Sequence, residues 1–157
     1  MTAAAQLMAG KKGLVMGVAN ERSIAWGIAK ACHDQGAEVA FTFQGEALEK
    51  RVRPLANSIG AKIIEPCDVT NAASIDAVFA KLEKEWGKLD FLVHAIAFSN
   101  KDELEGRYIN TSADNFALTM NISVYSFTAV AKRAEAMLNP GGSLLTLTYY
   151  GAEKYVP

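Results

Sequence analysis

The segment with the clearest capacity for chemistry runs from Gly17 to Gly27, directly after a short apolar stretch. If a strand ends at Gly17 and a helix begins at Ser23, the unpaired amides of the first helical turn face whatever lies above the strand. A pyrophosphate would satisfy those amides. Gly17 would allow a sharp turn, Ser23 would provide a hydroxyl and an amide, and Gly27 would let the helix pack closely on the sheet. Alternatively, Ser23 only caps a helix, which is worth about 1 kcal/mol, and the loop lacks the three-glycine fingerprint.

Further candidate residues follow the next apolar stretches. Gln44 would lie where dinucleotide folds contact the adenosine ribose. It is neutral, and the nearest basic residues are Lys50 and Arg51, which favours NADH over NADPH. Asp68 could accept a hydrogen bond from an adenine amino group or could simply start a helix. The small residues at 95–97 would let a flat cofactor lie against the backbone, or they are plain packing. Together these residues predict a dinucleotide site.

The elements that must position these residues alternate along the chain. Strands are predicted at 13–17, 39–43, 62–65, 91–94 and 143–148. Helices are predicted at 23–35, at 46–58 with an interruption or bend near Pro54, from Ile75 to Trp86, and at 113–137. Residues 140–142 are predicted to form a turn. Apolar strands joined by helices through short connections predict parallel pairing, so we expect an α/β, Rossmann-like, doubly wound sheet with strand order 3-2-1-4-5.

Composition excludes several classes of function. The chain has 157 residues, about one domain, with 16 basic and 17 acidic side chains, so nothing suggests a basic surface for nucleic acid. Neither a signal peptide nor an apolar run of roughly 18 residues is present. The two cysteines, Cys32 and Cys67, lack metal-ligand spacing, and we expect both to be reduced in a cytoplasmic protein that holds no metal.

The end of the chain also bears on its organisation. A single domain over residues 1–157 would stop directly after its fifth strand, leaving an apolar sheet edge uncovered. We therefore expect the domain to be incomplete at its C-terminus.

Four segments carry a resemblance to a known family. They are residues 17–27, 67–69, 94–98 and 144–153, with a Ser-Ile-Ala-x-Gly turn and a Leu-Thr-x-Tyr-x-Gly-Ala-Glu segment as the most specific parts. The sequence resembles the bacterial enoyl-[acyl-carrier-protein] reductases, a divergent branch of the short-chain dehydrogenases/reductases, over essentially the whole chain. Members reduce the double bond of a trans-2-enoyl thioester on acyl carrier protein with NADH during fatty-acid elongation. The resemblance also implies a homotetramer with the helix from Ala113 at an interface.

The resemblance assigns roles to individual positions. The positions that match NADH contacts are Gly17, Ser23, Ile24, Gln44, Asp68, Val69, Ala95 and Ile96. Phe98 and Ser99 match substrate contacts, and Tyr149 matches the first of two active-site tyrosines. The family's second tyrosine and its lysine would lie beyond Pro157.

Two other functions stay open. One is a non-catalytic dinucleotide-binding module that ends at Pro157. The other is a carbonyl-reducing short-chain dehydrogenase that uses Tyr150 and Lys154, which together form a Y-x-x-x-K motif. That motif works on a helix well after the fifth strand, whereas Tyr150 follows the strand at once and precedes Gly151, a poor helix residue. We expect His94 to be a hydrogen-bonded structural residue.

Overall fold

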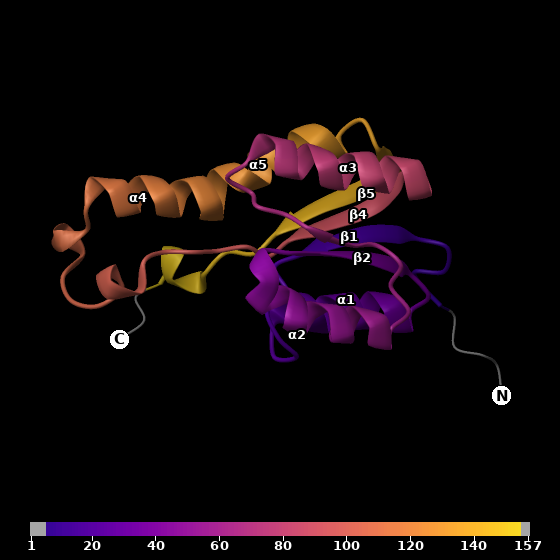
Figure 1. Cartoon of the computed structure of the whole chain (residues 1–157), viewed down its shortest axis with the longest axis horizontal. Coiled ribbons are helices and arrows are strands. Elements are labelled where there is room, and N and C mark those ends of the chain that lie inside the picture. The colour runs from indigo at the N-terminus through magenta and orange to yellow at the C-terminus, as the bar shows by residue number, and fades with distance from the viewer. Residues whose placement is uncertain (1–5, 155–157) are drawn as a thin grey trace.

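The chain forms one five-stranded sheet with helices on both faces (Figure 1), and the computed structural model describes residues 6–154. The strands are β1 (Lys12–Met16), β2 (Glu38–Phe43), β3 (Ile64–Pro66), β4 (Leu89–His94) and β5 (Leu138–Thr146). The main helices are α1 (Ile24–Asp34), α2 (Gly45–Ser58), α3 (Ala72–Trp86), α4 (Ala113–Met120) and α5 (Ser126–Ala134). A π-helical turn, Asn121–Tyr125, joins α4 to α5, and short 3₁₀ turns lie at Lys101–Glu103, Tyr108–Asn110 and Tyr150–Ala152.

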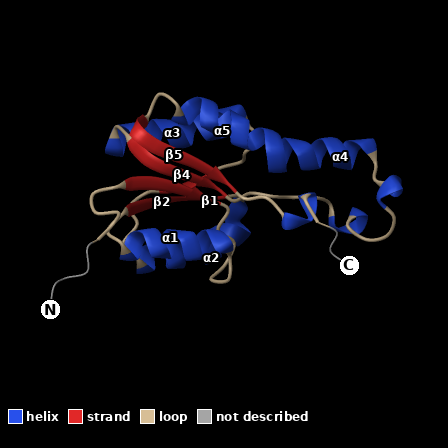
Figure 2. Ribbon diagram, turned by 180° about the vertical axis from the view of Figure 1, so that it is seen from behind, coloured by secondary structure: helices blue, strands red, loops and turns tan. Residues whose placement is uncertain are grey.

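The sheet has the predicted order, β3-β2-β1-β4-β5, and every pair of neighbouring strands is parallel. Helices α1 and α2 cover one face while α3 and α5 cover the other (Figures 1 and 2). Residues of β1 alternate between the two layers, since Leu14 and Met16 join the core under α3 and α5, and Val15 joins the core over α1 and α2. This burial on both faces explains why β1 is apolar at successive residues.

Helix α3 confirms the apolar stripe read from the sequence. Ile75, Val78, Phe79 and Leu82 are buried, and Trp86 packs partly buried against the same cluster. The Asn71 side chain caps the helix by accepting a hydrogen bond from the Ala73 amide, which satisfies one of the unpaired donors of the first turn.

Two helices differ from the predictions made for them. Helix α2 is not interrupted at Pro54 but continues to Ser58, because the proline removes only one amide donor while Val52 and Ala56 remain buried in the core and hold the helix in place. The predicted helix over 113–137 ends at Ala134, and a π-helical turn divides it.

The predicted turn at 140–142 is a bulge inside β5. Leu138 pairs with Leu89, but Ser143 already pairs with Phe91, so the residues between them loop out of the ladder. Gly141 there has a φ of +80°, a conformation that favours glycine.

Beyond the carboxyl ends of the strands, α4 projects past the sheet together with the 3₁₀ turns that precede it (Figures 1 and 2). Between residues 6 and 154, every helix is too short or too polar to cross a membrane.

Candidate functional site

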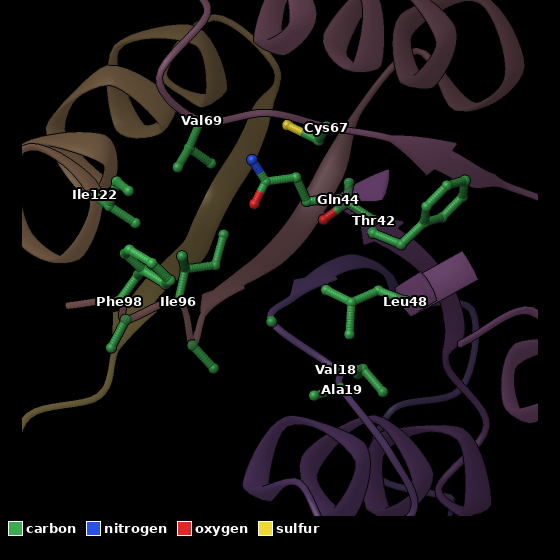
Figure 3. Close-up of a pocket in the computed structure, with 14 residues that line it drawn as sticks. Val18, Ala19, Thr42, Gln44, Leu48, Cys67, Val69, Ile96, Phe98 and Ile122 are labelled. Carbon is green, nitrogen blue, oxygen red and sulfur yellow. The ribbon is translucent and has the colours of Figure 1, made fainter. Parts of the chain in front are cut away.

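A pocket of about 200 Å³ opens at the carboxyl ends of β1 to β4. The chain leaves β1 toward β2 on one side and returns from β3 to β4 on the other, and open α/β sheets bind ligands at such a switch point. Figure 3 shows Ile96, Phe98 and Ile122 along one side of the pocket and Thr42 and Leu48 along the other. The residues that line it are Gly17, Val18, Ala19, Thr42, Phe43, Gln44, Leu48, Cys67, Val69, Ala95, Ile96, Ala97, Phe98 and Ile122.

The structure brings together only part of the predicted site. Gly17, Gln44, Val69, Ala95, Ile96 and Phe98 line the pocket. Ser23, Ile24, Asp68, Ser99 and Tyr149 are outside its lining.

Gly17 has two physical requirements that only glycine meets. Its φ is +97°, and a Cβ built there would lie 2.0 Å from the carbonyl oxygen of Ala95. The end of β1 therefore touches the backbone that follows β4, a contact that the sequence did not predict.

Ser23 braces the loop between β1 and α1. Its Oγ accepts hydrogen bonds from the amides of Ala19 (2.9 Å) and Asn20 (3.0 Å), and it makes no side-chain cap to the helix. Its own amide donates to the Asn20 carbonyl oxygen, so the predicted open amide at Ser23 is wrong. Because the oxygen accepts two hydrogen bonds, the hydroxyl proton is available to donate to an anion.

The first turn of α1 provides the open donors. The first amide in the helix with a backbone acceptor is that of Gly27, which donates to Ser23, so the Ile24 and Ala25 amides have none in the described part of the chain. Gly27 itself is exposed and a Cβ there would meet nothing within 4 Å, so its predicted packing role is wrong. Trp26 and Ala29 make that contact instead.

Gln44 and Asp68 lie at the ends of β2 and β3. The Gln44 side chain extends into the pocket (Figure 3). Asp68 accepts hydrogen bonds from the hydroxyl (2.7 Å) and amide (2.9 Å) of Thr70. These bonds, with a smaller contribution from Gln44, lower the pKa of Asp68. Asp68 thus fixes the turn before α3, and it is ionised at neutral pH. It does not start the helix, as its alternative role required, because the N-cap of α3 is Asn71.

The sequence did not assign seven of the lining residues to the site: Val18, Ala19, Thr42, Phe43, Leu48, Cys67 and Ile122. Burial, followed by the neighbouring charge of Asp68, raises the pKa of Cys67 to about 11, so its thiol is a neutral, apolar part of the wall. Ile122 comes from the π-helical turn, far along the chain from the strand ends. The spacing of residues in the sequence here is that of an ordinary helix, so it does not reveal the π-helical turn. No group of His, Cys, Asp or Glu among residues 6–154 is arranged to hold a metal ion.

His94 is buried below this wall and confirms the structural role expected for it. Its Nε2 lies 2.7 Å from Ser126 Oγ and its Nδ1 lies 3.2 Å from Thr146 Oγ1. The Ser126 hydroxyl donates to the Ile122 carbonyl (2.6 Å), so Nε2 must be the donor to Ser126 and Nδ1 the acceptor. Burial lowers the pKa of the ring, which is therefore neutral.

Three polar side chains follow β5. Tyr149 is 71% exposed, and its ring lies against Gly151, where a Cβ would approach it to 2.5 Å. The Lys154 ammonium lies over the face of the Tyr150 ring, 5.8 Å from its centre, not at the hydroxyl. Neither Tyr150 nor Lys154 lines the pocket, so the arrangement offers no support to the Y-x-x-x-K reading.

Within the part of the chain that the structure describes, a doubly wound parallel sheet with a pocket at its switch point and unpaired amides at the start of α1 defines a Rossmann-like, nucleotide-binding type of domain. Residues 17–157 match the family model described as Enoyl-(Acyl carrier protein) reductase. The chain belongs to this family.

Individual relatives agree with the family match. Enoyl-[acyl-carrier-protein] reductase [NADH] 1 from Rhizobium meliloti (strain 1021) is 67% identical over 157 residues, which are 100% of this chain and 58% of that protein. The corresponding NADH reductase from Bacillus subtilis (strain 168) is 51% identical over 94% of this chain and 58% of its own length. A crystal structure of the Anaplasma phagocytophilum reductase in complex with NAD has a TM-score of 0.91 and 59% identity, covering 96% of this chain and 58% of that one. The chain thus spans a little over half the length of these relatives.

Proposed function

We propose that this chain is the cofactor-binding part of an NADH-dependent enoyl-[acyl-carrier-protein] reductase. This oxidoreductase would reduce the carbon–carbon double bond of a trans-2-enoyl group on acyl carrier protein during fatty-acid elongation. The supporting observation is a pocket at the switch point, together with Ile24 and Ala25 amides that lack backbone acceptors among the described residues, in a chain that is 67% identical to a reductase named for NADH. Residues 1–157 would form one domain that is incomplete at its C-terminus.

The residues present fit a dinucleotide. The Ile24 and Ala25 amides and the Ser23 hydroxyl would hold the pyrophosphate, with the positive end of α1 behind them. Gly17 keeps side-chain atoms away from the turn.

The remaining proposed cofactor contacts lie along the strand ends. Gln44, Asp68 and Val69 would contact the adenosine, while Ala95 and Ile96 would lie against the rest of the cofactor. When bound, NADH supplies the hydride.

The reaction requires residues that bind the acyl group away from water and a residue that stabilises charge on the thioester oxygen. Phe98 and Ser99 would contact the acyl group, and the apolar side of the pocket formed by Ile96, Phe98 and Ile122 excludes water from the reacting carbons. Addition of hydride to the β-carbon moves negative charge onto the thioester oxygen, and a proton completes the reduction at the α-carbon. Tyr149 would donate a hydrogen bond to that oxygen and so lower the barrier.

We also propose that the complete protein is a cytoplasmic homotetramer with α4 at an interface. Phe116, Met120 and Val124 recur every four residues along α4 and the π-helical turn and are 50%, 42% and 53% exposed, forming an apolar stripe. Sedimentation of the full-length protein tests this assembly, and a monomer would refute it.

The function is tested by the loss of NADH absorbance when the full-length gene product is mixed with a trans-2-enoyl thioester of acyl carrier protein. We expect turnover with this substrate and none with the corresponding β-ketoacyl thioester. Binding of NADH without turnover of either substrate would favour the non-catalytic module. Turnover of the ketone that is lost in Tyr150→Phe would favour the carbonyl reductase.

A further inference from the structure

Helix α4, the π-helical turn and α5 form one long helix. One of its faces is polar, and the side chains on that face form hydrogen bonds within the protein. Ser112, Asn115, Thr119, Ser123 and Ser126 recur at steps of three and four residues, so they lie along one side of the helix. Ser126 forms a hydrogen bond with His94, the last residue of β4, and the other four bond to the segment that follows it, between Phe98 and Glu103. We call these five residues the polar stripe.

The outer half of the polar stripe holds the part of that segment farthest from the sheet. Ser112 Oγ donates to Glu103 Oε1 (2.8 Å), and the buried Asn115 accepts a hydrogen bond from the Asn100 amide (3.0 Å). Thr119 Oγ1 donates to Ser99 Oγ (2.9 Å). The two segments therefore run antiparallel.

The inner half reaches the pocket. Ser123 Oγ accepts a hydrogen bond from the Phe98 amide (3.1 Å) and donates one to the Phe98 carbonyl oxygen (3.2 Å). One hydroxyl thus fixes both main-chain groups of a residue whose side chain lines the pocket. The next residue back along the helix, Ile122, lines the pocket too, so Ser123 ties two parts of the same wall together.

Ser123 acts at the end of the wall that is not otherwise anchored by the sheet. The Ala95 amide donates to Met16 (3.1 Å), which attaches the start of the segment to β1. Three residues further on, Phe98 depends on Ser123 for both of its main-chain hydrogen bonds.

From this geometry we propose that Ser123 is a positioning residue that sets the affinity for the acyl group of the substrate. It contacts no substrate itself; it holds the Phe98 backbone so that Phe98 and Ile122 form one continuous apolar surface. This inference rests on the proposed function for the identity of the ligand. The contacts that it uses are independent of that function.

The test compares Ser123→Ala with Ser112→Ala in the full-length protein. The control makes the same substitution on the same polar stripe, but its hydroxyl meets Glu103 and caps α4 through the Asn115 amide, away from the pocket. For Ser123→Ala we expect roughly a three- to tenfold rise in KM for the enoyl thioester, the effect of losing hydrogen bonds of ordinary strength. We expect kcat and the Kd for NADH to stay close to wild type. Ser112→Ala should lower the melting temperature and leave KM unchanged. Ser123→Thr keeps a hydroxyl at this position, so it should have the wild-type KM.

An unchanged KM in Ser123→Ala, or an equal rise in both alanine variants, would overturn the proposal. Amide hydrogen exchange over residues 97–100 provides a readout without catalysis, and we expect faster exchange in Ser123→Ala than in wild type or Ser112→Ala. If the wild-type protein reduces no enoyl thioester, the proposed function fails. Exchange still decides the role of Ser123, because unaltered exchange in Ser123→Ala would refute it.

Discussion

Replacing Gly17 with alanine tests the contact that shapes the pocket. Two penalties add at this position. An L-residue at a φ of +97° is strained, at a cost of about 1–2 kcal/mol. The new Cβ would also lie 2.0 Å from the Ala95 carbonyl oxygen, whereas ordinary contact begins at 3.4 Å. The Cβ is fixed rigidly to one backbone and the oxygen belongs to another, so the ends of β1 and β4 must separate by more than an ångström, an overpacking that costs about 1–3 kcal/mol more.

Gly60→Ala is the matched control. Gly60 has a φ of +70° and nothing within 4 Å of an added Cβ, so it carries the strain without the collision. We expect Gly17→Ala to lower the free energy of unfolding by about 2–5 kcal/mol and Gly60→Ala by about 1–2 kcal/mol. Only the first substitution should weaken NADH binding, because only it displaces the backbone of the pocket.

Urea titration followed by circular dichroism measures the free energies of unfolding, and titration of NADH fluorescence measures its Kd. The m-values of both variants should match wild type, which would assign the difference to the folded state. If Gly17→Ala costs no more than Gly60→Ala, the ends of β1 and β4 are not held rigidly together. The pocket would then not depend on their contact.

Four other predictions follow from the site and the fold. Tyr149→Phe should lower kcat for enoyl reduction by about a hundredfold or more with little change in the Kd for NADH; a large loss of NADH binding would contradict the role given to Tyr149. The wild-type kcat/KM should favour NADH over NADPH because Gln44 is neutral, and equal efficiency with both would contradict that argument. Burial lowers the pKa of His94, so the unfolded chain gains a proton first as pH falls. Stability should therefore decline below the ordinary pKa of 6.5, and His94→Gln should flatten the dependence of the urea midpoint on pH. Asp90→Asn should cost about 1–3 kcal/mol in urea titrations without altering NADH affinity, since Asp90 receives hydrogen bonds from the Lys12 amide, Lys11 and Asn139 at the opposite end of the sheet.

The fold could be predicted because burial dictates residue type in most of its elements. β1 is covered on both faces, so Leu14, Val15 and Met16 are all apolar, and a run of this kind is distinctive. Helix α3 has one buried side, which the spacing of Ile75, Val78 and Leu82 records directly.

Two glycines show which structural roles the sequence can predict and which it cannot. Gly17 and Gly27 both occur in the turn that the sequence singled out, Gly17 as the residue of a sharp turn and Gly27 as a site of close helix packing. A Cβ at Gly17 would collide with Ala95, whereas one at Gly27 would enter open space. The difference depends on which backbone lies opposite, and the local sequence does not contain that information.

The polar stripe could not be predicted for a related reason. Polar residues every three or four positions are what a solvated helix face shows, so Asn115 and Ser123 gave no signal of their own. Their partners at 98–100 lie in irregular backbone, which has no periodicity to match. Irregular backbone near a core needs partners for its amides and carbonyls, so the segment after β4 required some such set of side chains, but not this one in particular.

The wall of the pocket is held from two sides by different forces. On the sheet side, Gly17 permits backbone contact with Ala95, and the Ala95 amide bonds to Met16. On the helix side, one hydroxyl, that of Ser123, holds Phe98. The first attachment combines a tight steric contact with a main-chain hydrogen bond and leaves almost no room for movement, whereas the second is a pair of hydrogen bonds at a partly exposed position and is easier to break. Thermal motion of the wall should therefore be concentrated toward Phe98, where the acyl group is expected, and be small at Ala95, where the cofactor is expected. A site with this division can keep its cofactor in a fixed geometry while adjusting to acyl chains of different shape.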